Sequence, residues 1–425
     1  MWHLGCVYAA CLAKLGYNVV GADEDSKIVK DLKRGEPPIY EPGLDNLIAT
    51  GLANGNLTFT DEIEEGVKGT SYVVIAYDTP IDEDDNVDLS IVFHAAQKLR
   101  KSRPHATVVV SSQVPVGTCQ QLASILDTDN VGLDLAYVPE NLRLGQAIDR
   151  FLTPEMLVIG ADTPSSMSST RALFKPIQTR IIEMDLRSAE MAKHALNAFL
   201  STSISFANEI GNICDLVGAD AFRVVDALRC DSRIGSKAML RPGLGFSGGT
   251  LARDLKILQR IGDKHGYKTE LVNAVLNVNE RQNALIGERL KRIVGNLQGK
   301  SIGVLGLTYK AGTSTLRRSA ALDIIDDLGR EGASVKVFDP HVDKADVLSE
   351  RVLVCEDAYS VCKDSDVLLI LNDWPEFANL DFTKIRLLMR KPILFDAQNL
   401  LDPKKVTESG IRYIATGRGS IYVQD

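Results

Sequence analysis

Two blocks of alternating strand-like and helix-like segments, separated by one long helical stretch, restrict the folds that this chain can adopt. In the first block, helical spacing at Asp25–Arg34 and Ser90–Leu99 alternates with compact apolar runs. These runs, rich in β-branched or aromatic residues, are Val19–Ala22, Tyr72–Ala76, Thr107–Ser111 and Leu135–Val138. Short apolar runs of this kind are typical of buried parallel strands. The first block therefore predicts a doubly wound, Rossmann-like α/β domain.

The middle and the end of the chain extend this pattern. Ser188–Val217 is predicted to form one long helix, because it contains no proline and Gly211 is its only glycine. Helical character continues to about Arg292, interrupted by a glycine-rich loop. Strands are then expected at Ser301–Leu305, Ser334–Phe338, Asp366–Leu371 and Pro392–Phe395. We therefore predict an α/β protein with two Rossmann-like doubly wound domains, 1–187 and 296–425, joined by a central helical domain, 188–295.

Composition and charge narrow the class of protein. At 425 residues the chain is long enough for two or three domains, and its 24% charged and 45% hydrophobic residues are typical of a soluble globular protein. The net charge of −8 argues against general nucleic-acid binding. No apolar run is long enough to span a bilayer, and no signal peptide opens the sequence. The seven cysteines lack the CxxC spacing of metal ligands, so we expect a cytoplasmic protein with reduced thiols and no metal site.

The beginning of the chain carries part of a dinucleotide-binding fingerprint. Gly5, followed by a helical run, is predicted to end a phosphate-binding turn, with a plain helix start as the alternative. Asp23 follows the strand Val19–Ala22, in the place where an acidic residue hydrogen-bonds the ribose 2′-hydroxyl of NAD. Only the last glycine of the G-x-G-x-x-G fingerprint is present, because Trp2 takes the place of the second. We therefore predict NAD binding through Gly5 and Asp23.

The strand that would precede this turn is missing from the sequence. Such a strand would be central in the sheet, so its absence would leave two neighbouring strands unpaired along buried edges. We therefore hypothesise that the polypeptide is longer at its N-terminus by one strand, about 5–10 residues. Intact-mass measurement on natively expressed protein tests this expectation.

A glycine-rich loop within the helical middle carries the clearest sign of a ligand site. Five glycines lie between positions 235 and 249, and glycine lets backbone amides approach a ligand closely because it has no Cβ. Arg233 precedes the loop, and Arg253 and Asp254 follow it. Arginine side chains beside such a loop suit a phosphorylated ligand. The loop therefore predicts a site for a phosphate-bearing molecule.

Ordered motifs along nearly the whole chain resemble those of the UDP-glucose/GDP-mannose dehydrogenase family. The glycine loop, which includes Pro242–Asp254, resembles that family's active-site loop. Further matching segments include Glu41-Pro42-Gly43-Leu44-Asp45, Thr79-Pro80, Val114-Pro115-Val116-Gly117-Thr118, Pro139-Glu140-Asn141, Gly306-Leu307-Thr308-Tyr309-Lys310, Trp374-Pro375 and Gly417-Arg418. The resemblance implies an NAD-binding N-terminal domain, a helical dimer core and a UDP-binding C-terminal domain.

The resemblance also implies an activity. In that family the primary alcohol of a nucleotide sugar is oxidised twice, to a carboxylate, with two NAD⁺ consumed, and a cysteine thiolate captures the intermediate aldehyde. By this resemblance we expect a homodimer that oxidises a UDP-sugar, such as UDP-glucose, at its C6 hydroxymethyl group for polysaccharide biosynthesis.

Five residues match the family's catalytic positions. Lys193 and Asn197, four apart and so on one helix face, resemble the pair that stabilises the developing oxyanion. Asp254 resembles the aspartate that helps activate water, and Glu140 resembles the glutamate near the sugar. Thr250 takes the place of the cysteine nucleophile. From the residues alone, an exposed lysine, a first-turn helix carboxylate and a loop salt bridge are the alternatives.

The resemblance further assigns residues to the two ligands. Thr79 and Pro80 join Gly5 and Asp23 as NAD-binding residues. The nucleotide sugar is expected to meet Arg233, Gly245, Phe246, Gly248, Lys310 and Arg317. Arg233 resembles an arginine that reaches the substrate across the dimer interface. The cations and the glycine loop together would form a pyrophosphate clamp, whereas any single cation could be simply solvated.

Departures from the family pattern bear on the reaction. A thiol with a pKa of about 8.5 is readily activated, whereas an aliphatic alcohol such as that of Thr250 needs a dedicated base. Leu144 also replaces a second glutamate of the family. We therefore predict one two-electron oxidation. Two alternatives stay open: a nucleotide-sugar-binding pseudoenzyme that regulates an active relative, and full oxidation of a hydrated aldehyde with Thr250 as a hydrogen-bonding group.

Overall fold

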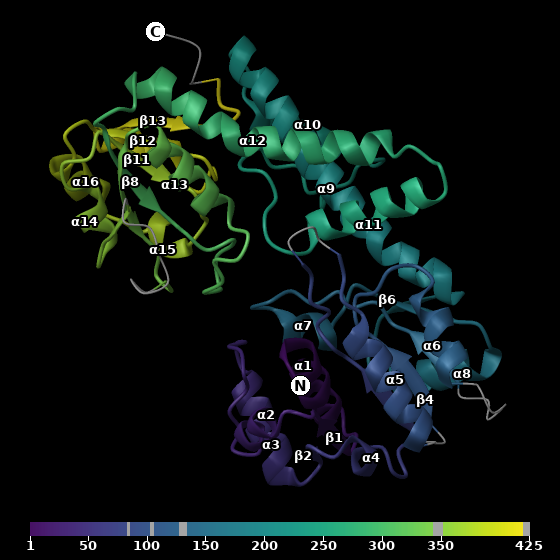
Figure 1. The fold of residues 1–425 in the computed structure, drawn as a ribbon. Helices are drawn as coiled ribbons and strands as arrows, with labels where there is room; N and C mark the ends of the chain where they lie inside the picture. Colours follow the sequence, from purple (N-terminus) through teal and green to yellow (C-terminus); the bar gives the residue numbers. More distant parts are fainter. Residues whose placement is uncertain (83–85, 103–105, 127–133, 343–351, 420–425) are drawn as a thin grey trace. The chain divides into compact units, whose positions relative to one another are not determined.

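A computed structural model describes residues 1–82, 86–102, 106–126, 134–342 and 352–419 of the chain (Figure 1). The chain forms two compact units, Met1–Ala195 and Leu196–Asp425, which are described in turn as the first and the second unit. Both contain parallel strands connected by helices, so the predicted α/β class is confirmed.

The first unit holds a two-stranded and a five-stranded sheet. In the smaller sheet, β1 (Val19–Ala22) pairs in parallel with β2 (Leu57–Thr60). The larger sheet has the order β3 (Tyr72–Ile75), β4 (Thr107–Val110), β5 (Leu135–Tyr137), β6 (Met156–Ala161) and β7 (Arg180–Met184). Its neighbours are parallel except β5 and β6, which are antiparallel. The predicted strands match β1, β3, β4 and β5 to within one residue at each end, whereas β2, β6 and β7 are absent from the prediction.

Helices connect and cover these strands. They are α1 (His3–Lys14), α2 (Ser26–Leu32), α3 (Leu44–Asn54), α4 (Ile63–Gly66), α5 (Ser90–Ser102), α6 (Thr118–Leu126), α7 (Ala147–Leu152) and α8 (Pro164–Leu173). Side chains fix some of their starts: Asp25 accepts hydrogen bonds from the first-turn N–H groups of α2, and Thr163 caps α8. Helix α1 is buried from Leu4 to Ala13 and packs against α3, α7 and β1 (Figure 1). An apolar helix of this kind belongs in a core.

The second unit begins with helices. The long predicted helix is α9 (Leu186–Val217), which starts in the first unit and continues into the second. It is followed by α10 (Ala221–Cys230), α11 (Leu251–Lys264) and α12 (Glu270–Val294). The glycine-rich loop lies between α10 and α11, so it connects two helices rather than a strand and a helix.

The second unit ends in a continuous six-stranded parallel sheet. Its order is β10 (Val352–Val354), β9 (Ser334–Phe338), β8 (Ser301–Leu305), β11 (Val367–Ile370), β12 (Ile393–Asp396) and β13 (Arg412–Ala415). The four predicted strands match β8, β9, β11 and β12 to within one residue at each end, and β10 and β13 are absent from the prediction.

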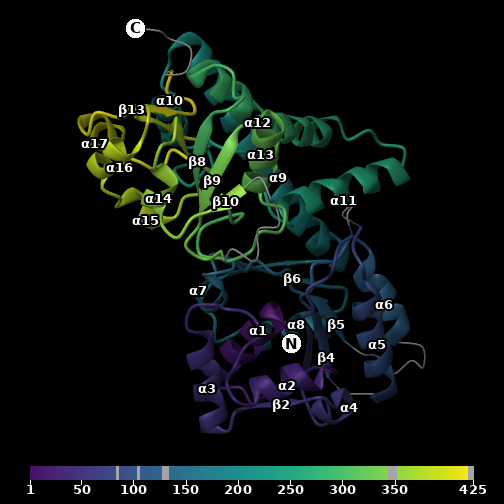
Figure 2. The same cartoon turned by 60° about the vertical axis from the view of Figure 1, so that its left-hand side comes forward.

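Helices cover both faces of this sheet, as a doubly wound fold requires. Successive strand side chains point to opposite faces. Val304 and Leu369 pack with residues of α12 and α13 (Ala320–Arg330), whereas Leu305 and Leu368 pack with residues of α14 (Ala358–Cys362) and α16 (Phe382–Leu388) (Figure 2). The remaining helices are α15 (Pro375–Ala378) and α17 (Pro403–Glu408).

Candidate functional site

Two predicted cofactor residues of the first unit, and the predicted catalytic residue Glu140, follow the ends of parallel strands. Asp23 comes directly after β1, Thr79 follows β3, and Glu140 follows β5. The carboxyl ends of parallel strands meet at one edge of a sheet, where open α/β folds bind their ligands. Thr79 is buried, and its Oγ1 donates a hydrogen bond to the backbone carbonyl of Gln113 at 2.8 Å. This bond fixes the Thr79-Pro80 turn against the segment that follows β4.

The start of α1 presents Gly5 to the same edge. A Cβ at Gly5 would lie 3.2 Å from Met1 Sδ and 3.5 Å from the carbonyl oxygen of Ala76, so glycine gives the closest approach there. The α-amino group of Met1 forms an ion pair with the carboxylate of Asp23, and burial lowers the pKa of that amino group. A carboxylate after β1, a helix N-terminus and the Thr79 turn are the donors and acceptors that a dinucleotide needs. The residues present therefore fit NAD.

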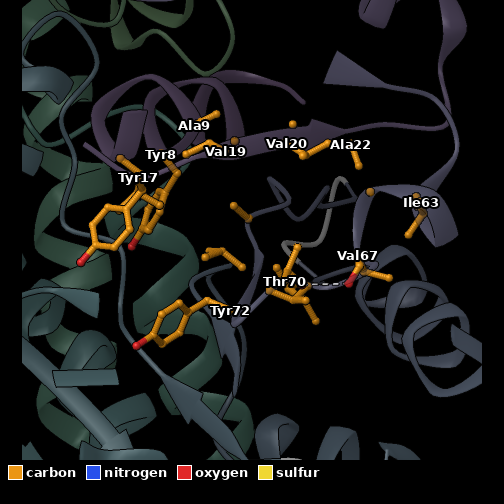
Figure 3. A pocket seen from close by; sticks show the side chains of 18 of the residues that line it. Tyr8, Ala9, Tyr17, Val19, Val20, Ala22, Ile63, Val67, Thr70 and Tyr72 are labelled. Carbon is orange, nitrogen blue, oxygen red and sulfur yellow. Dashed lines mark hydrogen bonds between the residues drawn. The ribbon is translucent and has the colours of Figure 1, made fainter. Parts of the chain in front are cut away.

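A cavity of about 630 Å³ separates β1 from β3 (Figure 3). Its lining includes Val19–Ala22 of β1, Tyr72–Ile75 of β3, and Tyr8 and Ala9 of α1. Strand β1 pairs with β2 and β3 pairs with β4, and within the described part of the chain neither strand has a partner on its other edge. The cavity therefore lies between two open strand edges. This is the place in which the sequence leads us to expect a further strand.

Lys193 is buried in the first unit, with 6% of its surface exposed. Its Nζ donates to the backbone carbonyl of Glu140 and lies 3.4 Å from Asn141 Oδ1 and 3.9 Å from Glu140 Oε2. The alternative of a solvated lysine is therefore wrong. A cationic side chain held against the segment after β5 can stabilise negative charge that develops nearby.

Asn197 and Asp254 form a buried pair in the second unit. Asn197 lies one turn after Lys193 on α9, and its Nδ2 donates to Asp254 Oδ2. Asp254 is fully buried in the first turn of α11, where the helix dipole favours a carboxylate. Thr250 is the N-cap of this helix; it is exposed, and its hydroxyl does not cap the helix N-terminus. The pair thus fixes a carboxylate one turn from the position of Thr250.

The glycine loop packs against the segment between β8 and α13. Gly248 has a φ of +82°, and a Cβ there would lie 2.8 Å from the ring of Tyr309, so the position requires glycine. Its N–H donates to the carbonyl of Arg318 at 3.0 Å, and Ser247 Oγ donates to the carbonyl of Tyr309 at 3.2 Å. Tyr309 and Arg318 directly flank the stretch that begins with Lys310 and ends with Arg317. The structure therefore brings these two predicted residues next to the loop.

The remaining predicted substrate residues, Gly245, Phe246 and Arg233, differ in their burial and contacts. Gly245 lies so close to Asn279 that a Cβ would come within 2.6 Å of its Oδ1. Phe246 is buried against Leu255 of α11. Arg233 lies after α10 with 86% of its side chain exposed, and its guanidinium donates to both carboxylate oxygens of Asp231. The described contacts therefore do not bring Arg233 to the glycine loop.

Sequence reasoning missed the side chains that hold the loop. Amides on α9 and α12 bind the backbone of Gly243–Phe246, among them Asn208 and Asn279. The spacing of Asn279, Gln282 and Asn283 on one helix face was the available signal.

No three His, Cys, Asp or Glu side chains in the described ranges gather as a metal-ligand set. No helix in that part of the chain has the length and apolar character needed to cross a membrane.

Comparison with known proteins identifies three family domains in order along the chain. The NAD-binding domain of the UDP-glucose/GDP-mannose dehydrogenase family matches residues 2–178, its central domain matches 187–281, and its UDP-binding domain matches 303–403. Together these matches span most of the chain.

Individual relatives agree with this result. UDP-glucose 6-dehydrogenase TuaD of Bacillus subtilis (strain 168) is 37% identical over 425 residues, which cover 99% of this chain and 92% of that protein. UDP-glucose 6-dehydrogenase of Rhizobium meliloti (strain 1021) is 35% identical over 98% of both chains. The solved UDP-glucose dehydrogenase of Pyrobaculum islandicum is 33% identical, with a TM-score of 0.88 over 99% of this chain and 96% of that one. The chain therefore belongs to the UDP-glucose/GDP-mannose dehydrogenase family and is an NAD-dependent oxidoreductase.

Proposed function

We propose that this protein oxidises the C6 hydroxymethyl group of a UDP-hexose, UDP-glucose or a close relative, once, to the aldehyde. The observation that carries the proposal is the buried Asn197–Asp254 pair, which fixes a carboxylate one turn after Thr250 at the end of a glycine loop. The names of the relatives support UDP-glucose as the sugar nucleotide. The UDP-binding domain match supports the uridine diphosphate moiety.

Each residue of the site has a role in this reaction. Bound NAD⁺, held by Gly5, Asp23, Thr79 and Pro80, supplies the hydride acceptor. Lys193 and Asn197 stabilise the alkoxide that forms as the C6 hydroxyl loses its proton, because a desolvated ammonium and a fixed amide donor are strong partners for developing negative charge. Asp254 receives that proton by way of water. One alcohol and one NAD⁺ thus give one aldehyde, one NADH and one proton. Glu140 and Asn141 keep the ammonium of Lys193 in place.

The glycine loop and its neighbours are proposed to hold the substrate. Gly245, Phe246 and Gly248 present backbone groups to the sugar nucleotide, and Lys310 and Arg317 supply positive charge for the pyrophosphate. Arg233 would join them from a second copy of the chain.

The reaction stops at the aldehyde because the chain has no nucleophile at the end of the loop. A Thr hydroxyl is a weak nucleophile unless a base activates it. In the proposed reaction Asp254, the carboxylate fixed nearby by Asn197, takes up the C6 proton and does not activate the Thr250 hydroxyl. Thr250 is therefore not expected to capture the aldehyde as a covalent adduct.

A second candidate function is binding of the nucleotide sugar without oxidation. Thr250 and Leu144 favour it, because they stand where the family has a nucleophilic cysteine and a second glutamate. In this case the protein would bind UDP-sugars and form no NADH.

We further propose that the cavity between β1 and β3 accommodates one more parallel strand. The Met1 amino group pairs with Asp23, which follows β1, so Met1 lies at the carboxyl end of that strand. A strand that ran through the cavity and entered α1 at this end would be parallel to β1 and β3. It would join the two sheets of the first unit. We also propose a division of the chain into domains 1–187, 188–295 and 296–425.

We also propose that the protein is a cytoplasmic homodimer. Phe199, Phe206 and Ile213 recur every seven residues along α9, and their exposed fractions are 70%, 47% and 49%. An apolar stripe with this spacing on a long helix suits contact with a second copy of that helix. All seven cysteines are free thiols, which suits a reducing compartment. Polysaccharide biosynthesis is the pathway that this activity would serve.

The yield of NADH per sugar tests the proposed reaction. The chain, with and without an added N-terminal strand, is incubated with NAD⁺ and limiting UDP-glucose, and the product is identified by mass. One NADH and an aldehyde are expected, and the Thr250→Cys variant should approach two NADH and a carboxylate because a thiolate can capture the aldehyde. Thr250→Ser is the matched control and should stay at one. Two NADH from the unaltered chain would refute the single oxidation, and UDP-glucose binding without NADH would support the second candidate.

A further inference from the structure

The backbone of the glycine loop is held by side-chain amides. Three N–H groups and three carbonyls of Gly243–Phe246 form six hydrogen bonds with Asn208 on α9 and with Asn279, Gln282 and Asn283 on α12. We propose that these four residues are positioning residues, which form an amide clamp that keeps the loop ready for a nucleoside diphosphate sugar before the ligand arrives. The inference rests on the proposed function for the identity of the ligand, but not for the clamp itself.

Asn279 makes the tightest part of the amide clamp. Its Oδ1 accepts from the N–H of Phe246 at 2.6 Å, and its Nδ2 donates to the carbonyl of Phe246 at 3.0 Å. A side-chain amide has a donor and an acceptor in one plane, so it pairs with a single residue's backbone as a neighbouring strand would. One side chain thereby satisfies both polar groups of the loop residue.

Asn208 on α9 also uses both its donor and its acceptor, but it binds two neighbouring loop residues. Its Oδ1 accepts from the N–H of Gly243 at 2.8 Å, and its Nδ2 donates to the carbonyl of Leu244 at 3.0 Å. Gln282 Nε2 donates to the carbonyl of Gly243 at 2.6 Å, and Asn283 Oδ1 accepts from the N–H of Gly245 at 3.0 Å. The loop is thus fixed from two sides.

A buried network anchors the amide clamp to the end of the C-terminal sheet. Asn212 Nδ2 donates to Gln282 Oε1 at 2.8 Å, and Arg289 donates to Asn212 Oδ1. Arg289 also pairs with Asp215 at 3.3 Å, and both side chains are almost completely buried. Asp215 in turn accepts from the N–H groups of Gly417 and Gly419, which follow β13. The position of the loop is therefore tied to the sheet through side chains that solvent does not reach.

The amide clamp is uncharged, which suits a negatively charged pyrophosphate ligand. A carboxylate in place of one of these amides would put negative charge directly beside a bound pyrophosphate, whereas an amide accepts the same hydrogen bond without that charge. A glycine-rich backbone is otherwise costly to order, because each residue loses conformational entropy when it is fixed. Hydrogen bonds to the Asn and Gln side chains order the loop before the ligand binds. Binding then costs less conformational entropy, so the affinity is higher.

The test compares Asn279→Ala with Asn277→Ala, an exposed asparagine on the same helix. Without ligand, the backbone amide of Phe246 should exchange about 10-fold faster in Asn279→Ala than in the unaltered chain, because the hydrogen bond from its N–H to Asn279 Oδ1 is lost. The affinity for UDP, measured by calorimetry, should fall by a similar factor while kcat at saturating UDP-glucose changes less than twofold. Asn277→Ala should change neither quantity.

The Asn279→Asp variant gives a second test, the pH dependence of UDP affinity, which would not change if Asn279 only stabilised the fold. An ionised carboxylate keeps the acceptor for Phe246 N–H but loses the donor, whereas a protonated carboxyl has both. The UDP affinity of this variant should therefore recover as the pH is lowered toward the carboxyl pKa, relative to the unaltered chain. Equal loop exchange in all variants would overturn the amide clamp. Faster exchange in a protein that binds no UDP-sugar would keep the amide clamp and overturn the proposed ligand.

Discussion

The two units use one β/α pattern, but only the second builds a continuous sheet from it. In the second unit β8 pairs on both sides, with β9 and with β11. Among the described residues of the first unit, β1 and β3 each pair with a strand on one side only, and a cavity of about 630 Å³ lies between them. The comparison shows that local sequence pattern is enough to form each βα element. Joining these elements into one sheet requires, in addition, a strand at the centre.

The difference extends to the candidate sites. In the second unit the glycine loop is held by amides, and Asp254 is held by Asn197, before any ligand is present. In the first unit the Asp23 carboxylate pairs instead with the Met1 amino group. We infer that the nucleotide-sugar side is pre-organised by side chains of its own unit.

The largest expected structural effect comes from filling the cavity. An N-terminal extension of seven residues rich in Val and Ile should protect the amides of β1 and β3 from hydrogen exchange and raise the midpoint of thermal unfolding by about 5 °C or more. Each buried Val or Ile side chain contributes about 1.5–3 kcal/mol, and ordering each residue costs about 1–2 kcal/mol. A surplus of about 1–2 kcal/mol shifts the midpoint by a few degrees in a unit of this size. A Gly/Ser extension of equal length is the control, and equal protection by both extensions would contradict the proposal.

Lys193→Ala should lower kcat by about 10²–10³-fold, because it removes a buried cation that stabilises developing charge. Lys193→Arg keeps the charge and should lose less activity. The thermal midpoint of each variant separates a catalytic loss from unfolding. A kcat within threefold of the unaltered chain would exclude Lys193 from the proposed role.

Gly248→Ala should weaken UDP binding by about 1–3 kcal/mol, because a Cβ at positive φ is strained and would meet the ring of Tyr309. Gly249→Ala is the matched control, since a Cβ at that glycine has no neighbour within 4 Å. Titration calorimetry with UDP measures both. Similar losses in the two variants would show that loop flexibility, rather than the contact with Tyr309, determines affinity.

The smallest effect concerns two cysteines, one in each unit. Burial raises the pKa of Cys6 in the first unit and of Cys362 in the second to about 12. Both thiols should therefore react slowly with an alkylating reagent at pH 8, because little thiolate is present. If the first unit opens more readily, Cys6 reacts faster than Cys362, as peptide mass analysis over time would show. Equal rates would indicate equal opening of the two units.

The sequence predicted those features that depend on local pattern. Strands β8 and β9 are short, largely β-branched or apolar segments inside a sheet and were predicted with their observed bounds. Strand β2 was missed because it is short and only its alternate residues, Leu57 and Phe59, are buried. Strand β13 was missed because its apolar character is confined to its last residues.

Burial, and contacts between residues far apart along the chain, could not be predicted from the sequence. The spacing of Lys193 and Asn197 placed them on one helix face. That Lys193 is buried against Glu140, and Asn197 against Asp254, depends on segments more than 50 residues away. The amides of the clamp share a helix face in the sequence, but asparagine is common on exposed helix faces, so their spacing alone does not show that they bind the loop.

Hydrogen exchange on the unaltered chain tests the central comparison most directly. Amides of the two unpaired edges, in β1 and β3, are followed beside those of β8 and β11 in the same sample. We predict that the amides on the unpaired edges of β1 and β3 exchange at least 100-fold faster than the amides of β8 and β11. An open edge leaves its N–H groups without strand partners. Equal protection in the two sheets would contradict the account of an open first unit and a closed second one.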